Sequence, residues 1–311
     1  MPDSSLRRAA IVGLGWTGQS YGLALKRAFP SVVIVGHDRD AEAAKTARKL
    51  GAVQKTHWNL ISACDAAELV VLALPGREAL DSLLALAGEL PPETLVTDTA
   101  PLKAALVAWA TENASEGLRY VPGHPLLERT PEPSADAFSG RAYCLTPAPQ
   151  SDAAAVSSMV NLAERLGAKV TFLDPEEHDS LMIALEHLPA LVASATVQML
   201  QASNTRTDLH WLRQAIPAEV LSLAERVGEL RGAELSAANR EALRHWLERL
   251  QAGLGVLRDA VGQENGKGLA ELIERVQGTG ERWLPGARHD DGAVDTGPGG
   301  GTYWRRMMGM R

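Results

Sequence analysis

The sequence has little cysteine and no concentrated positive charge, and each shortage excludes a class of protein. Only Cys64 and Cys144 occur among 311 residues, which excludes a disulfide framework and favours a reducing compartment. Both lie beside apolar runs, so we expect buried thiols rather than nucleophiles. The net charge is −7 and Lys and Arg form no stripe, so a nucleic-acid partner is not expected.

Long apolar runs are scarce as well. No window approaches the roughly 20 apolar residues of a membrane span, and the short polar start runs into a strand pattern without the features of a signal peptide. We therefore expect a cytoplasmic protein without a membrane partner. A chain of 311 residues is long enough for two domains, each with its own core.

Short β-branched runs alternate with helical stretches from residue 8 to about 174. The expected strands are Ala10–Val12, Val32–Gly36, Leu69–Leu74, Thr94–Thr97, Arg119–Val121, Tyr143–Leu145 and Lys169–Phe172. Amphipathic stretches such as Ala41–Leu50, Glu78–Leu86 and Ala153–Leu166 separate them. This alternation predicts an α/β fold, a largely parallel sheet covered by helices on both faces.

The strand signal stops after Leu173. Asp174 is a predicted N-cap, followed by Pro175 in the first turn and by glutamates that complete a capping box. Helical patterns then continue to about Val276. We expect three parts: a domain over 1–174, an all-α domain over 175–278, and a glycine-rich, polar tail over 279–311 that is expected to be disordered.

A glycine-rich turn, Gly13-Leu14-Gly15-Trp16-Thr17-Gly18, follows the first strand and opens a helix. The three glycines allow a tight turn, backbone approach to a pyrophosphate, and close helix–strand packing. Asp38 ends the second strand, 20 residues after Gly18, where it can accept hydrogen bonds from ribose hydroxyls. The pattern predicts a Rossmann-type domain that binds a nicotinamide cofactor.

The charge beside the predicted ribose site bears on the choice of cofactor. Asp38 favours NAD because it would repel a 2′-phosphate, whereas Arg39 could hold that phosphate, so NADP stays open. Leu74 and Pro75 follow a strand and are expected to pass beneath the cofactor. The predicted cofactor-binding residues are Gly13, Gly15, Trp16, Thr17, Gly18, Asp38, Arg39, Leu74 and Pro75; no metal site is predicted.

His124 stands between Gly123 and Pro125 after a predicted strand, where a substrate would meet the nicotinamide. Several segments in order now resemble the prephenate/arogenate dehydrogenases of tyrosine biosynthesis. They are Gly13–Ser20, Gly36–Arg39, Ala67–Pro75, Val96–Asp98 with Lys103, Gly123–Pro125, Leu145–Pro147, Leu173–Asp179 and His187–Pro189. The resemblance implies NAD(P)-dependent oxidative decarboxylation of prephenate or arogenate, with His124 taking up the hydroxyl proton, in a homodimer formed by the helical domain.

Three departures from the family pattern concern the substrate. Pro101 stands where the family has a serine, Leu126-Leu127 where it has Ala-Gly, and Glu186–Ala190 where it has Ser-His-Leu-Pro-His. Two alternatives therefore remain: an NAD(P)-dependent dehydrogenase or reductase of another small acid or imine, and a nucleotide-binding regulator that has lost catalysis.

The helical domain is expected to complete the substrate site. On a straight helix His178 and His187 would face opposite sides, but Pro189 should kink the helix and turn His187 toward the substrate. His178 and Asp179 are expected to pack at the domain junction. Arg226 is the predicted substrate-binding arginine, ahead of Arg213 and Arg206. The stripe Leu243, Leu247, Leu250, Leu254 and Leu257 is by its spacing typical of a core face.

Overall fold

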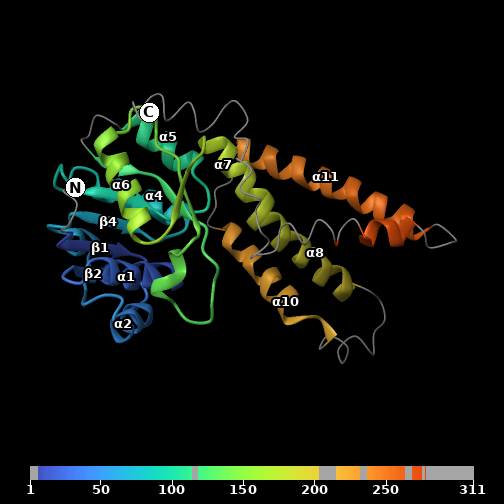
Figure 1. Ribbon diagram of the computed structural model, residues 1–311, viewed down its shortest axis with the longest axis horizontal. Helices are drawn as coiled ribbons and strands as arrows, with labels where there is room; N and C mark the ends of the chain where they lie inside the picture. The colour runs from blue at the N-terminus through green and yellow to red at the C-terminus, as the bar shows by residue number, and fades with distance from the viewer. Residues whose placement is uncertain are drawn as a thin grey trace.

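The computed structural model describes residues 6–113, 118–202, 215–231, 237–262, 268–274 and 277. Figure 1 shows a sheet domain wrapped by helices and a helical part that projects away from it. Arg206, Arg213 and the predicted tail over 279–311 lie outside the described residues.

The main sheet has six parallel strands in the order β3-β2-β1-β4-β5-β6. They are β1 (Arg8–Val12), β2 (Val33–His37), β3 (Lys55–Thr56), β4 (Leu69–Leu72), β5 (Leu95–Asp98) and β6 (Arg119–Val121). The helices beside it are α1 (Trp16–Ala28), α2 (Ala41–Leu50), α3 (Leu60–Cys64), α4 (Gly76–Leu86), α5 (Ala104–Glu112) and α6 (Ala153–Arg165). The predicted parallel sheet is confirmed.

Both faces of this sheet are buried, because alternate residues of each strand enter different cores. Ile11 belongs to the cluster that includes Tyr21 of α1 and Met159 of α6. Val12, its neighbour, belongs to the cluster that includes Leu83 of α4. Cys64 and Cys144 are free and buried, as predicted.

A second, three-stranded sheet corrects the single sheet that we expected. It consists of β7 (Gly123–Pro125), β8 (Ala142–Leu145) and β9 (Lys169–Phe172), with β7 antiparallel and β9 parallel to β8. Strands β3 and β7 were not predicted, because strands of two or three residues are too short for alternation to show. A Cβ on Gly123 would lie 2.7 Å from the Tyr143 ring and 3.0 Å from the Thr97 hydroxyl, so only glycine fits where β7 crosses β5.

The helical part contains α7 (Pro175–Met182), a π-helical turn (Ile183–His187), α8 (Leu188–Ala202), α10 (Ala218–Glu225), η5 (Arg226–Arg231) and α11 (Ala237–Val261). Asp174 caps α7 as predicted, accepting from the backbone N–H groups of Glu176 and Glu177. Helix α10 packs against α8 and α11 against α7, and α8 and α11 diverge away from the sheet domain (Figure 1). The described residues after β9 contain no strand.

The helix distortion falls just before Pro189 and takes the form of the π-helical turn. A proline within a helix removes one N–H group and clashes with the carbonyl four residues earlier. A π turn inserts one extra residue and relieves that conflict. At about 100° per residue, the insertion reduces the angle between His178 and His187 from about 180° to about 80°.

Two apolar surfaces of the helical part differ from the sequence expectations. Leu247, Leu254 and Leu257 of α11 are 41%, 53% and 41% exposed, so the interpretation of this stripe as core is wrong for the single chain. Among the described residues, one helical run, Pro175–Ala202, is long and apolar enough to cross a membrane, with a mean hydropathy of 1.5. That run begins in the buried domain junction and packs against α10, and 28% of its apolar window is buried.

Candidate active site

The glycine-rich turn between β1 and α1 has the shape of a phosphate cradle. Gly13 has φ +89°, and a Cβ on it would lie 2.3 Å from the Ala73 carbonyl oxygen; one on Gly18 would lie 1.9 Å from that of Gly13. The first and third glycines are therefore required by internal packing. A Cβ on Gly15 would meet nothing within 4 Å, and no side chain caps the helix that starts after it. The free N–H groups of this helix end suit a pyrophosphate.

Asp38 lies at the end of β2 beside this turn. Its carboxylate accepts hydrogen bonds from the backbone N–H of Leu14 (2.6 Å) and of Asp40 (2.8 Å). Arg39 is exposed next to it. The carboxylate is thereby fixed to the rim of the cradle, where a ribose attached to the pyrophosphate would lie.

The remaining predicted cofactor residues surround the same turn. Leu74 would lie 2.8 Å from a Cβ on Gly13, and Pro75 precedes α4. Trp16 and Thr17 open α1, and the indole N–H of Trp16 donates to the Thr130 carbonyl (2.9 Å). The segment that follows β7 therefore contacts the start of α1.

His124 lies on β7 and is 5% exposed. Its Nδ1 is 3.2 Å from Nε2 of His178, and its Nε2 is 3.8 Å from Oε1 of Glu186. Burial lowers the pKa of His124 well below its ordinary value, and the nearby Lys103, His178 and His187 lower it further. The imidazole is therefore neutral at pH 7, the form that accepts a proton.

A buried ion pair between Lys103 and Asp98 contacts β7, the strand that carries His124. Lys103 Nζ donates to the Asp98 carboxylate and to the Gly123 carbonyl (2.7 Å), and both charged side chains are 0% exposed. Asp98 also accepts from the Tyr120 hydroxyl (2.7 Å) and from the Ala100 N–H (2.9 Å). Burial lowers the pKa of Lys103, and the negative charge of Asp98 opposes this shift. Neither residue was assigned a role from the sequence.

Asp179 joins the two parts of the molecule, as its predicted place at the junction requires. It accepts hydrogen bonds from the N–H groups of Lys103 (2.6 Å) and Ala104 (3.0 Å), and so caps α5 of the sheet domain. It also accepts from the Asn239 amide of α11 (3.2 Å). His178 and Asp179 are both 0% exposed. No helix periodicity could reveal that a carboxylate on α7 caps α5.

His187 lies in the π turn, is 5% exposed, and belongs to the groups whose charge acts on His124. The opposite orientation of His178 and His187 that a straight helix would give does not occur, because the π turn before Pro189 brings both side chains toward His124. Arg226 is half-buried at the start of η5, a segment that packs against α8.

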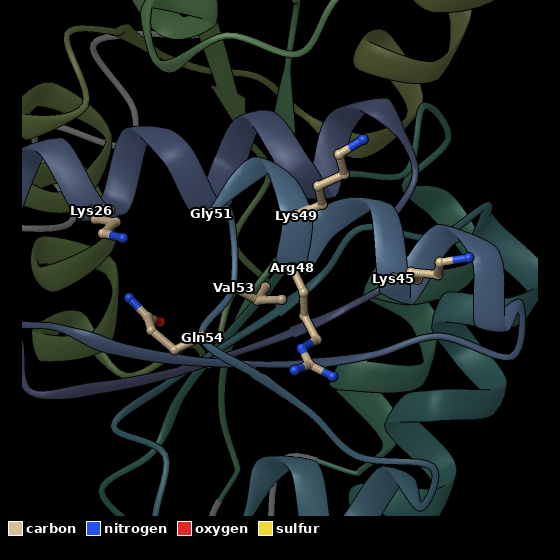
Figure 2. Close-up of a pocket in the computed structure, with 7 residues that line it drawn as sticks. All are labelled: Lys26, Lys45, Arg48, Lys49, Gly51, Val53 and Gln54. Carbon is tan, nitrogen blue, oxygen red and sulfur yellow. The ribbon is translucent and has the colours of Figure 1, made fainter.

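One cavity, of about 560 Å³, lies apart from these groups. Its lining residues are Lys26, Lys45, Arg48, Lys49, Gly51, Val53 and Gln54. Figure 2 shows Lys45, Arg48 and Lys49 pointing in different directions rather than toward one centre. Lys26, Arg48 and Lys49 are in the last turns of α1 and α2, where cations complement the helix dipole. Within the described ranges, no three His, Cys, Asp or Glu side chains gather as a metal site.

Two family models match the chain consecutively. The model described as "Prephenate dehydrogenase, nucleotide-binding domain" matches residues 21–172, and "Prephenate dehydrogenase, dimerization domain" matches residues 174–275. The chain belongs to the prephenate dehydrogenase family. This membership confirms the predicted fold, a Rossmann-type sheet domain followed by a helical domain.

Curated relatives are a quarter to a third identical to this chain over the aligned residues. Prephenate dehydrogenase of Bacillus subtilis is 32% identical over 192 residues, 60% of this chain and 52% of the relative. The chain thus spans about half the length of that relative. Cyclohexadienyl dehydrogenase of Zymomonas mobilis is 25% identical over 276 residues, 87% of this chain and 94% of the relative.

Solved structures share the fold. Prephenate dehydrogenase of Aquifex aeolicus, in complex with hydroxyphenyl propionate and NAD+, superposes with a TM-score of 0.78 at 24% identity, covering 90% of this chain and 99% of that one. Synechocystis arogenate dehydrogenase gives a TM-score of 0.66 at 22% identity, covering 89% and 100%.

Proposed function

We propose that the protein is an NAD(P)-dependent dehydrogenase that converts prephenate or arogenate toward tyrosine by oxidative decarboxylation. The observation that supports this most directly is the buried, neutral His124, set beside the sheet domain of a prephenate dehydrogenase family member. We also propose a division into domains at residue 174. The two buried free thiols suit the cytoplasm.

The cofactor would be held by the start of α1, with Gly13, Gly15, Trp16, Thr17 and Gly18 around the pyrophosphate. Asp38 would take the ribose hydroxyls, Leu74 and Pro75 would lie beneath the dinucleotide, and Arg39 is the group that a 2′-phosphate would need. NAD is favoured because the Asp38 carboxylate is fixed at the cradle by two backbone donors. When bound, the nicotinamide supplies the hydride acceptor.

His124 would act on the ring hydroxyl of the substrate. Its Nε2 takes the hydroxyl proton while the hydride leaves the same carbon, so that carbon becomes a carbonyl. The ring carboxylate then leaves as carbon dioxide, its bonding electron pair enters the ring, and the phenolate recovers the proton from His124. His187, beside His124, and Arg226, a cation suited to a carboxylate, are the proposed substrate-binding residues.

We further propose a homodimer formed through the helical domain. Leu247, Leu254 and Leu257 expose a stripe on α11, and the matching family model is named for dimerisation. A second copy would bury this apolar stripe.

The test follows reduced nicotinamide by its absorbance, with prephenate and L-arogenate offered against NAD and NADP. We expect turnover that His124→Asn abolishes while cofactor binding is retained, and that His245→Asn, on the exposed side of α11, leaves unchanged. Cofactor binding without turnover of either acid would refute the proposal. It would favour one of the alternatives, a dehydrogenase of a different small acid or a regulatory protein. The departures from the family pattern, among them Pro101 with no hydroxyl at the family's serine position, are the reason for these alternatives.

A further inference from the structure

A second histidine lies behind His124, on the side away from Glu186. His178 of α7 directs its Nε2 to the His124 Nδ1, and its own Nδ1 lies 3.1 Å from Oδ1 of Asp179. Three residues from the two parts of the molecule therefore form one buried chain of hydrogen bonds. The role inferred for it below rests on the proposed function of His124.

The direction of each hydrogen bond follows from Asp179. Its carboxylate already receives the N–H groups of Lys103 and Ala104 and the Asn239 amide, and a carboxylate can only accept. The proton between Asp179 and His178 therefore belongs to Nδ1 of His178. Burial lowers the pKa of His178 and keeps the ring neutral, so its Nε2 has no proton and accepts.

The tautomer of His178 determines that of His124. Because Nε2 of His178 accepts, Nδ1 of His124 must donate across the 3.2 Å separation. A neutral imidazole carries one proton, so the Nε2 of His124 is left with its lone pair. The opposite tautomer would turn an N–H toward Glu186 and leave no base.

We propose that His178 and Asp179 are positioning residues that hold His124 in its Nδ1–H tautomer and so keep Nε2 as the proton acceptor. In serine proteases an aspartate behind the catalytic histidine has this effect directly, and loss of the correct tautomer lowers kcat by about 10⁴-fold. Here the effect passes through a second imidazole, and the aspartate also holds the two domains together.

Two substitutions at His178 separate positioning from packing. His178→Gln offers an amide oxygen to His124 and an amide N–H to Asp179, whereas His178→Phe fills the space with no polar atom. We expect His178→Phe to lower kcat by about 10²- to 10⁴-fold, the range of general-base catalysis, with KM and cofactor Kd nearly unchanged. His178→Gln should retain most of the activity. Equal losses in the two variants would overturn the proposal.

The tautomer itself is measurable without turnover. In wild-type protein with ¹⁵N-labelled histidine, long-range ¹H–¹⁵N spectra should show His124 and His178 protonated at Nδ1 and bare at Nε2, with assignments from His124→Asn and His178→Gln. The exposed His245, which lies outside this chain of hydrogen bonds, provides an internal reference signal. A proton on Nε2 of His124 would overturn the inference even if the enzyme is active. The expected tautomer in a protein that turns over neither ring acid would uphold the geometry and refute only the proposed function.

Discussion

Replacing Lys103 with methionine would break the buried ion pair beneath the histidine strand. Removing one partner from such a pair leaves a buried charge and costs about 3–5 kcal/mol. Asp98 would retain its hydrogen bonds from Tyr120 and Ala100, so we expect a loss near the lower end, about 3 kcal/mol. At about 2–4 °C per kcal/mol for a domain of this size, Tm should fall by about 6–12 °C.

The same substitution should alter the pH dependence of catalysis. The positive charge of Lys103 is among the causes that lower the pKa of His124, after burial. Without it the pKa of His124 rises toward its ordinary value, so more of the imidazole is protonated at a given acidic pH. The acid limb of the kcat/KM profile, which reports the free enzyme, should therefore move to higher pH.

Urea unfolding and thermal melting measure the stability effect, and the double variant Lys103→Met with Asp98→Asn provides the control. With both charges removed, much of the lost stability should return. Lys45→Met breaks an exposed pair with Glu42 and should cost less than about 1 kcal/mol. A Lys103→Met protein as stable as the Lys45→Met protein, with an unshifted acid limb, would refute this account of the pair.

The other expectations concern the cradle, acid stability and the dimer. Gly15→Ala should weaken cofactor binding and leave Tm unchanged, whereas Gly18→Ala, whose Cβ would lie 1.9 Å from a carbonyl oxygen, should lower Tm. Titration calorimetry measures the binding and thermal melting the stability of the two variants. The reverse pattern would contradict the geometry of the cradle. The pKa values of His124 and His178 are lowered in the folded protein, so on acidification the unfolded chain binds these protons first. The free energy of unfolding should therefore be constant above about pH 6.5 and fall below it by up to about 1.4 kcal/mol per pH unit for each histidine. Equal urea midpoints at pH 7.5 and 5.5 would exclude this effect. Leu254→Asp should convert the proposed dimer to a monomer in light scattering, and an unchanged mass would contradict an interface at this stripe.

The elements with long, regular patterns could be predicted from the sequence. The helix Ala41–Leu50 was found with its bounds, and so was the cap at Asp174. The strand β7 could not be predicted, because three residues that include a glycine and a proline show neither alternation nor β propensity. Its existence depends on Gly123, which allows the close crossing of β5.

Much of the site was accessible only from the fold. His124 was singled out by its neighbours in sequence, but its partner His178 lies 54 residues further along the chain. Regular helical periodicity would place His178 and His187 on opposite sides, and Pro189 indicated a distortion that turns His187. The π turn that produces this change cannot be recognised from apolar spacing. Asp98 and Lys103 were noted from the sequence only as residues that match a family motif, because a buried ion pair produces no periodic pattern in the sequence.

Both neighbours of the proposed base, His124, that lie at its ring nitrogens come from the helical domain. His178 and Glu186, which lie within 4 Å of the two ring nitrogens of His124, belong to α7 and the π turn, whereas His124 belongs to the sheet domain. On the sheet side, Pro101 offers no hydroxyl where the family has a serine. The orientation of the imidazole therefore depends on how the domains dock, and Asp179 fixes that docking by capping α5. A change at the junction should thus alter the pH dependence of kcat before it alters cofactor binding, because the cradle at Gly15 is built entirely within the sheet domain.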